Sequence, residues 1–228
     1  MTRTACIVIS ANSEWRALKA FYQPQRVEAT PFKETFALSL SGWDCQFLHQ
    51  GVGKIAAAAA TQYAVDRWQP RLIINPGTCG GIAGKIEAGQ VVMAAETLVY
   101  DIYERMGDPQ EPIEFYTTRH DFSYLRQPYP IEVVQTRLLS ADQDLDPHQI
   151  PWLVETYQAA AVDWESGAIA WTAARNGRPC LVLRGVTDLV SPEGGESYDL
   201  LELYHQRTDQ VMPPILESLP AWLEAADL

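Results

Sequence analysis

The stretch KIAAAAATQYAVDRWQPRLIIN, residues 54–75, predicts a helix that is followed at once by a strand. Its first part is rich in alanine, the residue with the highest helix propensity, and Pro70 ends the helical pattern. A helix face made of alanine packs closely, which favours contact with a sheet. The short apolar run RLIIN then has the composition of a buried strand. This unit predicts an α/β fold.

The rest of the chain repeats this alternation of strands and helices. Further strands are predicted in CIVIS, in the hairpin TFALSLSGWDCQFLHQ with its turn at Ser41 and Gly42, and in QVVMAAETLVY, IEVVQTRLLSA and PCLVLRGVT. Helices are predicted in SEWRALKAFY with Ser13 as N-cap, in ESGAIAWTAARNG, and from Tyr198 to the C-terminus with an interruption at Pro213 and Pro214. Residues 102–130 are irregular and predict a long loop or lid.

This order of elements predicts one domain over residues 1–228. We expect a three-layer α/β sandwich with a central mixed, largely parallel β-sheet covered by helices. In such folds ligands bind beyond the carboxyl ends of the strands. That rule brings together Glu14 after the first strand, the glycine-rich residues 77–84, and Asp188.

The composition argues against several classes of function. A formal charge of −12 and a pI near 4.7 argue against a nucleic-acid partner, which needs a basic surface. The four cysteines form no C-x-x-C pair and the four histidines have no metal-ligand spacing, so we expect reduced thiols and no metal. No segment approaches the roughly 20 apolar residues of a membrane span. We therefore expect a cytoplasmic protein with no membrane partner.

The stretch LVLRGVTDLV, residues 181–190, reads as a buried strand that ends on an acid. A carboxyl group in that position must be solvated, paired or used in chemistry. In VDWES, Glu165 enters a helix, where its charge suits the helix dipole, and Asp163 is a candidate cap. Each of these acids also has an ordinary structural explanation.

Two glycine-rich motifs allow more than one interpretation. GVGKIA matches the first part of a dinucleotide fingerprint, but the next strand ends in Asn75 and Pro76 where an acid is required. The alternatives are a tight turn that needs glycine at positive φ, or a role in substrate binding. In NPGTCGG, Cys79 is either a nucleophile opposite His49 or a small buried residue, and the latter is the commoner use of cysteine.

Taken in order, residues 51–96 (GVGKIAAAAATQYAVDRWQPRLIINPGTCGGIAGKIEAGQVVMAAE) and 159–190 (AAAVDWESGAIAWTAARNGRPCLVLRGVTDLV) resemble the nucleoside phosphorylase and nucleosidase superfamily. They are most similar to the 5'-methylthioadenosine/S-adenosylhomocysteine nucleosidases. The resemblance implies that Asp188 donates a proton to N7 of a leaving purine and that Glu14 activates water. It implies no cofactor, a small nucleoside as substrate, and assembly as a homodimer or a larger oligomer.

The same resemblance assigns the substrate-binding residues. Glu165 would accept hydrogen bonds from the ribose hydroxyls, and Trp164 stands where a methionine packs on the sugar. The remaining members of the predicted binding set are Asp163, Thr78, Cys79 and Gly80. An aspartate at position 188, rather than an asparagine, suits a 6-aminopurine, because a carboxylate accepts from the exocyclic amine after it has given up its proton.

The sequence departs from the family at several of these places. In SADQD, Asp144 replaces the aromatic residue that stacks on the purine. Either another aromatic serves, with Tyr100, Phe115, Tyr116 and Tyr124 as candidates, or the base differs. The methionine that normally follows the first strand has no counterpart, and residues 102–130 do not resemble the family.

Three activities stay open. Hydrolysis is favoured because a glutamate at position 14 suits a water nucleophile and would repel an incoming phosphate. The first alternative is a phosphate-dependent purine nucleoside phosphorylase, for which the arginine cluster is missing. The second is a non-catalytic nucleoside-binding relative, against which the retention of Glu14, Glu165 and Asp188 argues.

Overall fold

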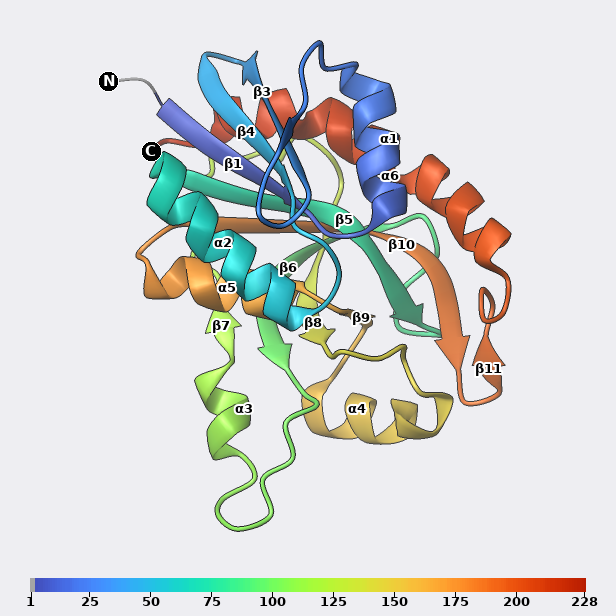
Figure 1. Ribbon diagram of the computed structural model, residues 1–228. Coiled ribbons are helices and arrows are strands. Elements are labelled where there is room, and N and C mark those ends of the chain that lie inside the picture. Colours follow the sequence, from blue (N-terminus) through green and yellow to red (C-terminus); the bar gives the residue numbers. More distant parts are fainter. Residues whose placement is uncertain (1–2) are drawn as a thin grey trace.

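A computed structural model describes residues 3–228 and shows the alternation of strands and helices (Figure 1). The helices are α1 (Asn12–Tyr22), α2 (Lys54–Trp68), α3 (Glu111–Phe115), α4 (Ile150–Tyr157), α5 (Ser166–Arg175) and α6 (Leu201–Ala225). The strands are β1 (Arg3–Ile9), β2 (Glu28–Ala29), β3 (Glu34–Leu40), β4 (Trp43–His49), β5 (Leu72–Ile82), β6 (Val91–Val99), β7 (Thr118–Arg119), β8 (Val134–Ser140), β9 (Ala161–Asp163), β10 (Cys180–Ser191) and β11 (Gly194–Gly195).

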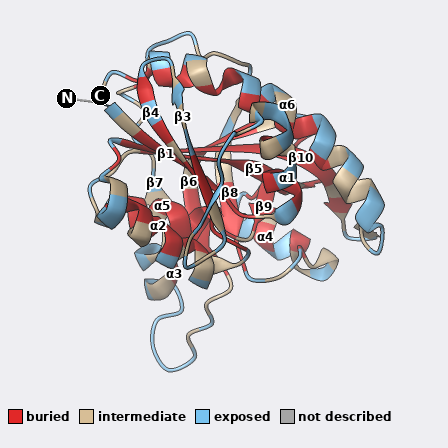
Figure 2. Ribbon diagram, turned by 45° about the horizontal axis from the view of Figure 1, so that its top comes forward, coloured by how far each residue is buried: buried red, intermediate tan, exposed pale blue. Residues whose placement is uncertain are grey.

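The two faces of β1 show why the fold has three layers. Ile7 and Ile9 pack in a core that contains residues of α1 and α6, whereas Cys6 and Val8 pack in a second core with the alanines of α2 and α5. Successive side chains of a strand point to opposite faces, so one continuous apolar strand serves both layers. Figure 2 shows this sheet as the most buried part of the molecule. The predicted three-layer sandwich is confirmed.

The sheet is mixed, as predicted, although antiparallel pairs slightly outnumber parallel ones among the described strands, six to five. β1 pairs in parallel with β4 and β5, and β5 pairs in parallel with β10. β5, β10, β6, β8 and β9 pair with one another in a closed circuit, in which β6–β10 and β5–β9 are antiparallel. Parallel pairing is confined to two runs, β4–β1–β5–β10 and β6–β8–β9, so the description "largely parallel" does not hold for the sheet as a whole.

Three predicted boundaries were wrong. β5 continues through the glycine-rich residues to Ile82, because β10 pairs with it along that whole length. β10 likewise runs on to Ser191, so Asp188 lies inside the strand and not at its end. α6 is not interrupted at Pro213 and Pro214, since its buried apolar face stays in contact with the sheet across the two prolines.

Other predictions were confirmed closely. α2 spans residues 54–68, and the hairpin between β3 and β4 turns at Ser41 and Gly42, both at positive φ. Residues 102–130 are mostly irregular, with the short α3 and β7 inside them. The part that leads into α3 projects from the sandwich (Figure 1), whereas Leu125 packs in the core with α6. No helix within residues 3–228 is both long enough and apolar enough to cross a membrane.

Candidate active site

Parallel strands bring the predicted acids together at one edge of the sheet. Glu14 follows β1, Thr78 lies in β5 and Asp188 lies in β10, and these three strands are neighbours. Glu165 joins them from the connection between β9 and α5. The three acids are between 2% and 7% exposed, so each is a buried carboxyl group that needs partners or a function.

Glu14 lies in the first turn of α1 and is held by three hydrogen bonds. The backbone N–H of Ala11 donates to Oε2 at 3.0 Å, and Thr78 donates to Oε1 from its backbone N–H at 2.7 Å and from its hydroxyl at 2.9 Å. Ala11 is the N-cap, so the prediction that Ser13 caps this helix was wrong. Here the glutamate side chain reaches back to the cap backbone and satisfies one of the free N–H groups of the first turn.

The sequence analysis missed Arg184, which is fully buried in β10. Its Nε lies 2.9 Å from Asp163 Oδ2, its Nη2 donates to Asn75 Oδ1 at 2.7 Å, and its Nη1 lies 3.6 Å from Glu14 Oε1. A buried cation stays charged only when acids compensate it, so Arg184 holds the two carboxylates of Glu14 and Asp163 at fixed positions. The one signal in the sequence was an arginine inside an otherwise apolar strand.

Gly77 explains how Arg184 and Glu14 can approach each other. A Cβ atom on Gly77 would lie 1.8 Å from Arg184 Nη1 and 2.8 Å from Glu14 Oε1. The guanidinium therefore occupies the space that any side chain at position 77 would need. Glycine at position 77 is therefore required for the close approach of these two side chains.

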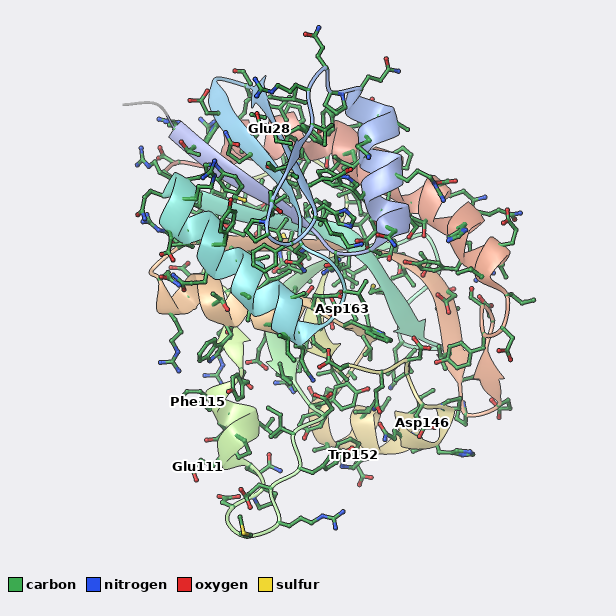
Figure 3. The ribbon with its side chains drawn as sticks, in the orientation of Figure 1. Glu28, Glu111, Phe115, Asp146, Trp152 and Asp163 are labelled. Carbon is green, nitrogen blue, oxygen red and sulfur yellow. The ribbon has the colours of Figure 1, made fainter. Side chains whose placement is uncertain are left out.

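Asp163 is occupied by the protein itself. Its carboxylate accepts from the Ser140 hydroxyl at 2.6 Å, from the backbone N–H of Glu165 at 3.2 Å and from the backbone N–H and hydroxyl of Ser166. Together with Arg184, these contacts tie β8, the start of α5 and β10 to one carboxylate. Figure 3 shows Asp163 in the interior, far from the peripheral Phe115 and Glu111.

Glu165 faces the start of α2. Its Oε1 accepts from the backbone N–H of Gly53 at 2.9 Å, and burial raises the pKa of its carboxyl to about 8, with a smaller contribution from the charge of Asp163. Gly51 and Gly53 have φ values of 91° and 93°, which confirms that this turn needs glycine at positive φ. The GVG motif thus presents a backbone donor to a site acid.

Asp188 sits at an irregularity of β10. The register with β5 shifts between Val186 and Asp188, as in a β-bulge, which re-aims a side chain. Burial raises the pKa of its carboxyl, opposed by a hydrogen bond from the Thr187 hydroxyl at 2.7 Å and by the charge of Arg207. Asp188 therefore keeps its proton to a higher pH than an ordinary aspartate does.

The shifted pKa of Glu165 predicts a pH-dependent stability. Between pH 4.5, the ordinary pKa of a glutamate, and about pH 8, Glu165 is ionised in the unfolded chain but protonated in the folded protein. The free energy of unfolding therefore falls as the pH rises through this window, and it reaches its full reduction above pH 8. We expect Glu165→Gln to be more stable than wild type at pH 9, on the order of 2–5 kcal/mol, and equally stable near pH 4.5.

Thermal unfolding at a series of pH values measures this difference. Glu155→Gln, at an exposed position on α4, is the matched control and should follow the wild-type curve at every pH. A parallel displacement of the Glu165→Gln curve at all pH values would contradict the assignment, because it would not involve titration.

Cys79 and His49 do not have the properties of a nucleophile and its base. The Cys79 side chain packs in the core beside α2 and α5, and burial raises the pKa of its thiol, which disfavours the reactive thiolate. His49 stacks on Trp15 with ring centroids 5.0 Å apart, and burial lowers its pKa to about 4. At position 79 it is the backbone that borders the site.

The aromatic candidates for a purine platform lie in different places. Tyr100 is buried against Trp152, Tyr124 packs on the core beneath α6, and Phe115 and Tyr116 cluster with Trp171. A further aromatic residue, Tyr198, was not predicted as a platform; burial and the nearby charges of Asp144 and Asp188 raise the pKa of its hydroxyl. Of these tyrosines it is the one that lies in the electrostatic surroundings of Asp188.

The described residues also contain a pocket that is separate from the site acids. This pocket of about 590 Å³ lies beside β3, lined among others by Tyr22, Arg67 and Trp68, and none of the site acids lines it. Within residues 3–228, no three histidine, cysteine or acidic side chains are arranged to hold a metal ion.

The fold and its side chains define an α/β protein with a set of buried carboxyl groups beside the carboxyl ends of its central parallel strands. Residues 6–213 match the model of the Phosphorylase superfamily. The chain therefore belongs to the phosphorylase superfamily, and the resemblance seen in the sequence is confirmed.

Individual relatives are similar over most of their length. A 5'-methylthioadenosine/S-adenosylhomocysteine nucleosidase of Tolumonas auensis is 27% identical over 199 residues, which cover 82% of this chain and 86% of the relative. The Streptococcus pneumoniae MTA/SAH nucleosidase, solved in complex with 8-aminoadenine, aligns with a TM-score of 0.79 at 18% identity over 99% of this chain and all of that one. The nucleosidase of Colwellia psychrerythraea, solved with adenine, aligns with a TM-score of 0.76 at 23% identity, covering 100% and 97% of the two chains.

Proposed function

We propose that this chain hydrolyses the N-glycosidic bond of a purine nucleoside or thionucleoside, with a 5'-methylthioadenosine or S-adenosylhomocysteine type of substrate. The observation that carries the proposal is a pair of buried carboxyl groups in opposite surroundings. Burial raises the pKa of Asp188 and favours its protonated form, whereas Glu14 accepts three hydrogen bonds and faces a guanidinium, which suits a carboxylate. Such a pair is the usual arrangement of an acid and a base. The names of the relatives support the same activity.

In the proposed reaction Asp188 gives its proton to N7 of the purine. The bond between C1' and N9 then breaks, both electrons stay on the purine, and the sugar becomes an oxocarbenium-like cation. Glu14 takes a proton from a water molecule as its oxygen bonds to C1'. The products are the free base and the free sugar, with one water consumed. Arg184 keeps Glu14 in place through this step.

The remaining predicted residues receive roles in binding. We assign to Glu165 the binding of the ribose hydroxyls. Hydrogen bonds donated by these hydroxyls to its carboxylate would favour the ionised form of Glu165. Trp164 and the strand segment from Thr78 to Gly80 would border the sugar and the base, with position 79 contributing its backbone. Asp163, whose carboxylate is fully used inside the protein, would support Glu165 and Arg184.

The charges around the site favour water over phosphate as the nucleophile. Arg184 is the one fully buried cation of the described chain, and it is already paired with Asp163 and Glu14. Arg16, the arginine of the stretch that follows β1, is half exposed and pairs with Asp209 on the surface. A phosphate ion would therefore meet more negative than positive charge.

We accordingly expect base release that does not depend on phosphate. The measurement is purine release, followed by chromatography, from methylthioadenosine, S-adenosylhomocysteine, adenosine, inosine and guanosine, each with and without phosphate. Adenine release at equal rates under both conditions is the expected result. A rate that requires phosphate would favour the phosphorylase, and binding of these nucleosides without any release would favour the non-catalytic relative.

We further propose a homodimer or larger oligomer in a reducing, cytoplasmic compartment. Exposed apolar side chains lie at the start of α2 and in the projecting segment: Ile55 is 86% and Met106 97% exposed, with Val52 and Tyr103 also exposed. Exposed apolar side chains in this number are typical of an interaction surface. The four cysteines are all free thiols, which suits a reducing environment. The mass in solution tests the assembly.

A further inference from the structure

The last helix contributes a tyrosine hydroxyl to the hydrogen bonds around Glu14. Tyr204 lies in the first turn of α6, and its hydroxyl oxygen is 3.3 Å from Ser13 Oγ and 3.3 Å from Thr78 Oγ1. Thr78 in turn donates its hydroxyl to Glu14 Oε1. The tyrosine is 191 residues from Ser13 in the chain, so only the packing of α6 against α1 and β5 brings these groups together.

Counting protons gives this chain of hydroxyl groups a single direction. A hydroxyl has one hydrogen to donate, and Thr78 uses its own on the carboxylate of Glu14. Between Tyr204 and Thr78 the tyrosine must therefore be the donor, and it then accepts from Ser13. The order is Ser13 to Tyr204 to Thr78 to Glu14, with every hydrogen pointing toward the carboxylate.

This direction suits an ionised acceptor at the end of the chain. Hydrogen bonds in a row polarise one another, so the donor strength of the Thr78 hydroxyl increases when Tyr204 donates to it. Burial raises the pKa of the Tyr204 hydroxyl, and it therefore stays a donor at every pH at which the protein would work. The hydroxyl of Thr78 is also prevented from turning away from Glu14.

The start of α6 is held firmly enough to position a side chain. Thr208 donates its hydroxyl to the Tyr204 carbonyl at 2.8 Å, and Arg207 donates to the carbonyl of Thr187 at 3.1 Å and pairs with Glu196 at 2.6 Å. Thr187 is the neighbour of Asp188 in β10. The first turns of α6 therefore contact β10, which carries Asp188, through Arg207, and they reach Glu14 through Tyr204 and Thr78.

We propose that Tyr204 is a positioning residue for the general base Glu14, acting through the hydroxyl of Thr78. The inference rests on the proposed function, in which Glu14 activates water. It assigns a role to the hydroxyl alone, since the ring of a phenylalanine would fill the same space beside Ser13 and Thr78. The reaction step that benefits is the attack of water and not the binding of the nucleoside.

A double-mutant cycle tests this assignment. Tyr204→Phe is expected to lower kcat about five- to tenfold and to change KM less than about threefold, because the lost hydrogen bond acts on the base. Thr78→Val, which keeps the shape and removes the hydroxyl, should lower kcat at least as much. In the Thr78→Val background, Tyr204→Phe should change kcat by less than about twofold, since the residue through which it acts is gone.

The matched control is Tyr22→Phe. The Tyr22 hydroxyl also links α1 to α6, by donating to the Leu216 carbonyl at 2.7 Å, but it lies outside the site. This variant should lower the melting temperature and leave kcat unchanged. Ser13→Ala provides a second variant of the hydroxyl chain, and it should lower kcat about two- to threefold in the wild-type background and have no effect when Tyr204 is already phenylalanine.

The possible results distinguish a failure of the positioning role of Tyr204 from a failure of the proposed nucleosidase function. If the wild-type protein releases base and Tyr204→Phe keeps wild-type kcat, or if its effect adds fully to that of Thr78→Val, the positioning role is wrong and the proposed function stands. If the wild-type protein releases no base from any nucleoside of the panel, the proposed function and this inference fall together.

Discussion

Replacing Asp188 with asparagine is expected to lower the turnover of purine release by about a thousandfold, within the range of 10²–10⁴ that a general acid contributes. Asparagine has nearly the same shape and still fits beside the Thr187 hydroxyl, but it has no proton to transfer to N7. Without that proton the purine must leave as an anion, which is a poor leaving group. The measurement is kcat on the best substrate of the panel, with Asp44→Asn, an exposed aspartate of β4, as the control.

A change of leaving group sharpens this test. A nitrophenyl riboside releases nitrophenolate, a stable anion that needs no protonation, so Asp188→Asn should hydrolyse this substrate at close to the wild-type rate. Equal losses on the nitrophenyl riboside and on the nucleoside would show that Asp188 supports the structure of the site instead of donating a proton.

The pH dependence of the wild-type enzyme should agree. As the proposed general acid, Asp188 would act only while protonated, so we expect the rate of purine release to fall as the pH rises through its pKa. Burial raises that pKa above the ordinary value for aspartate, which moves the fall to higher pH. The nitrophenyl riboside should lack this basic limb, since its cleavage does not use the proton.

The acids of the site could be predicted from the sequence, because each lies just after or within a strand of a recognisable motif. The strand-end rule named Glu14 and Asp188, and the family resemblance added Glu165. The structure buries all three, with Glu14 after β1, Asp188 within β10 and Glu165 just before α5. The helix over residues 54–68 was also predictable, since alanine, Pro70 and the following strand all favour the same boundaries.

The residues that support these acids could not be predicted in the same way. Arg184 is a charge in an apolar strand, and its partners Asn75, Asp163 and Glu14 come from three other elements. Tyr204 is separated from Thr78 by 126 residues and carries no local motif. The extended bounds of β5 and β10 depend on their mutual pairing, and α6 continues through its prolines because of packing. These are tertiary effects that override local propensity.

Glu14→Ala is expected to lower hydrolysis by about 10²–10⁴-fold while nucleoside binding is largely retained, since the base takes part only when water attacks. The variant removes the acceptor of three hydrogen bonds and leaves Arg184 with one carboxylate partner fewer. A stability loss on the order of 1–3 kcal/mol should accompany the change, and the melting temperature measures it.

Adding azide to Glu14→Ala shows whether the lower rate comes from the missing general base or from the lower stability of the variant. The small anion fits the space vacated by the carboxylate, is attracted by Arg184, and attacks C1' without giving up a proton, so no base is needed. We expect azide to restore purine release in Glu14→Ala and to yield a glycosyl azide in place of the free sugar. Azide should not restore Asp188→Asn on a nucleoside, because there the missing proton belongs to the leaving group. Rescue of both variants, or of neither, would show that the two carboxyl groups do not divide the work as base and acid.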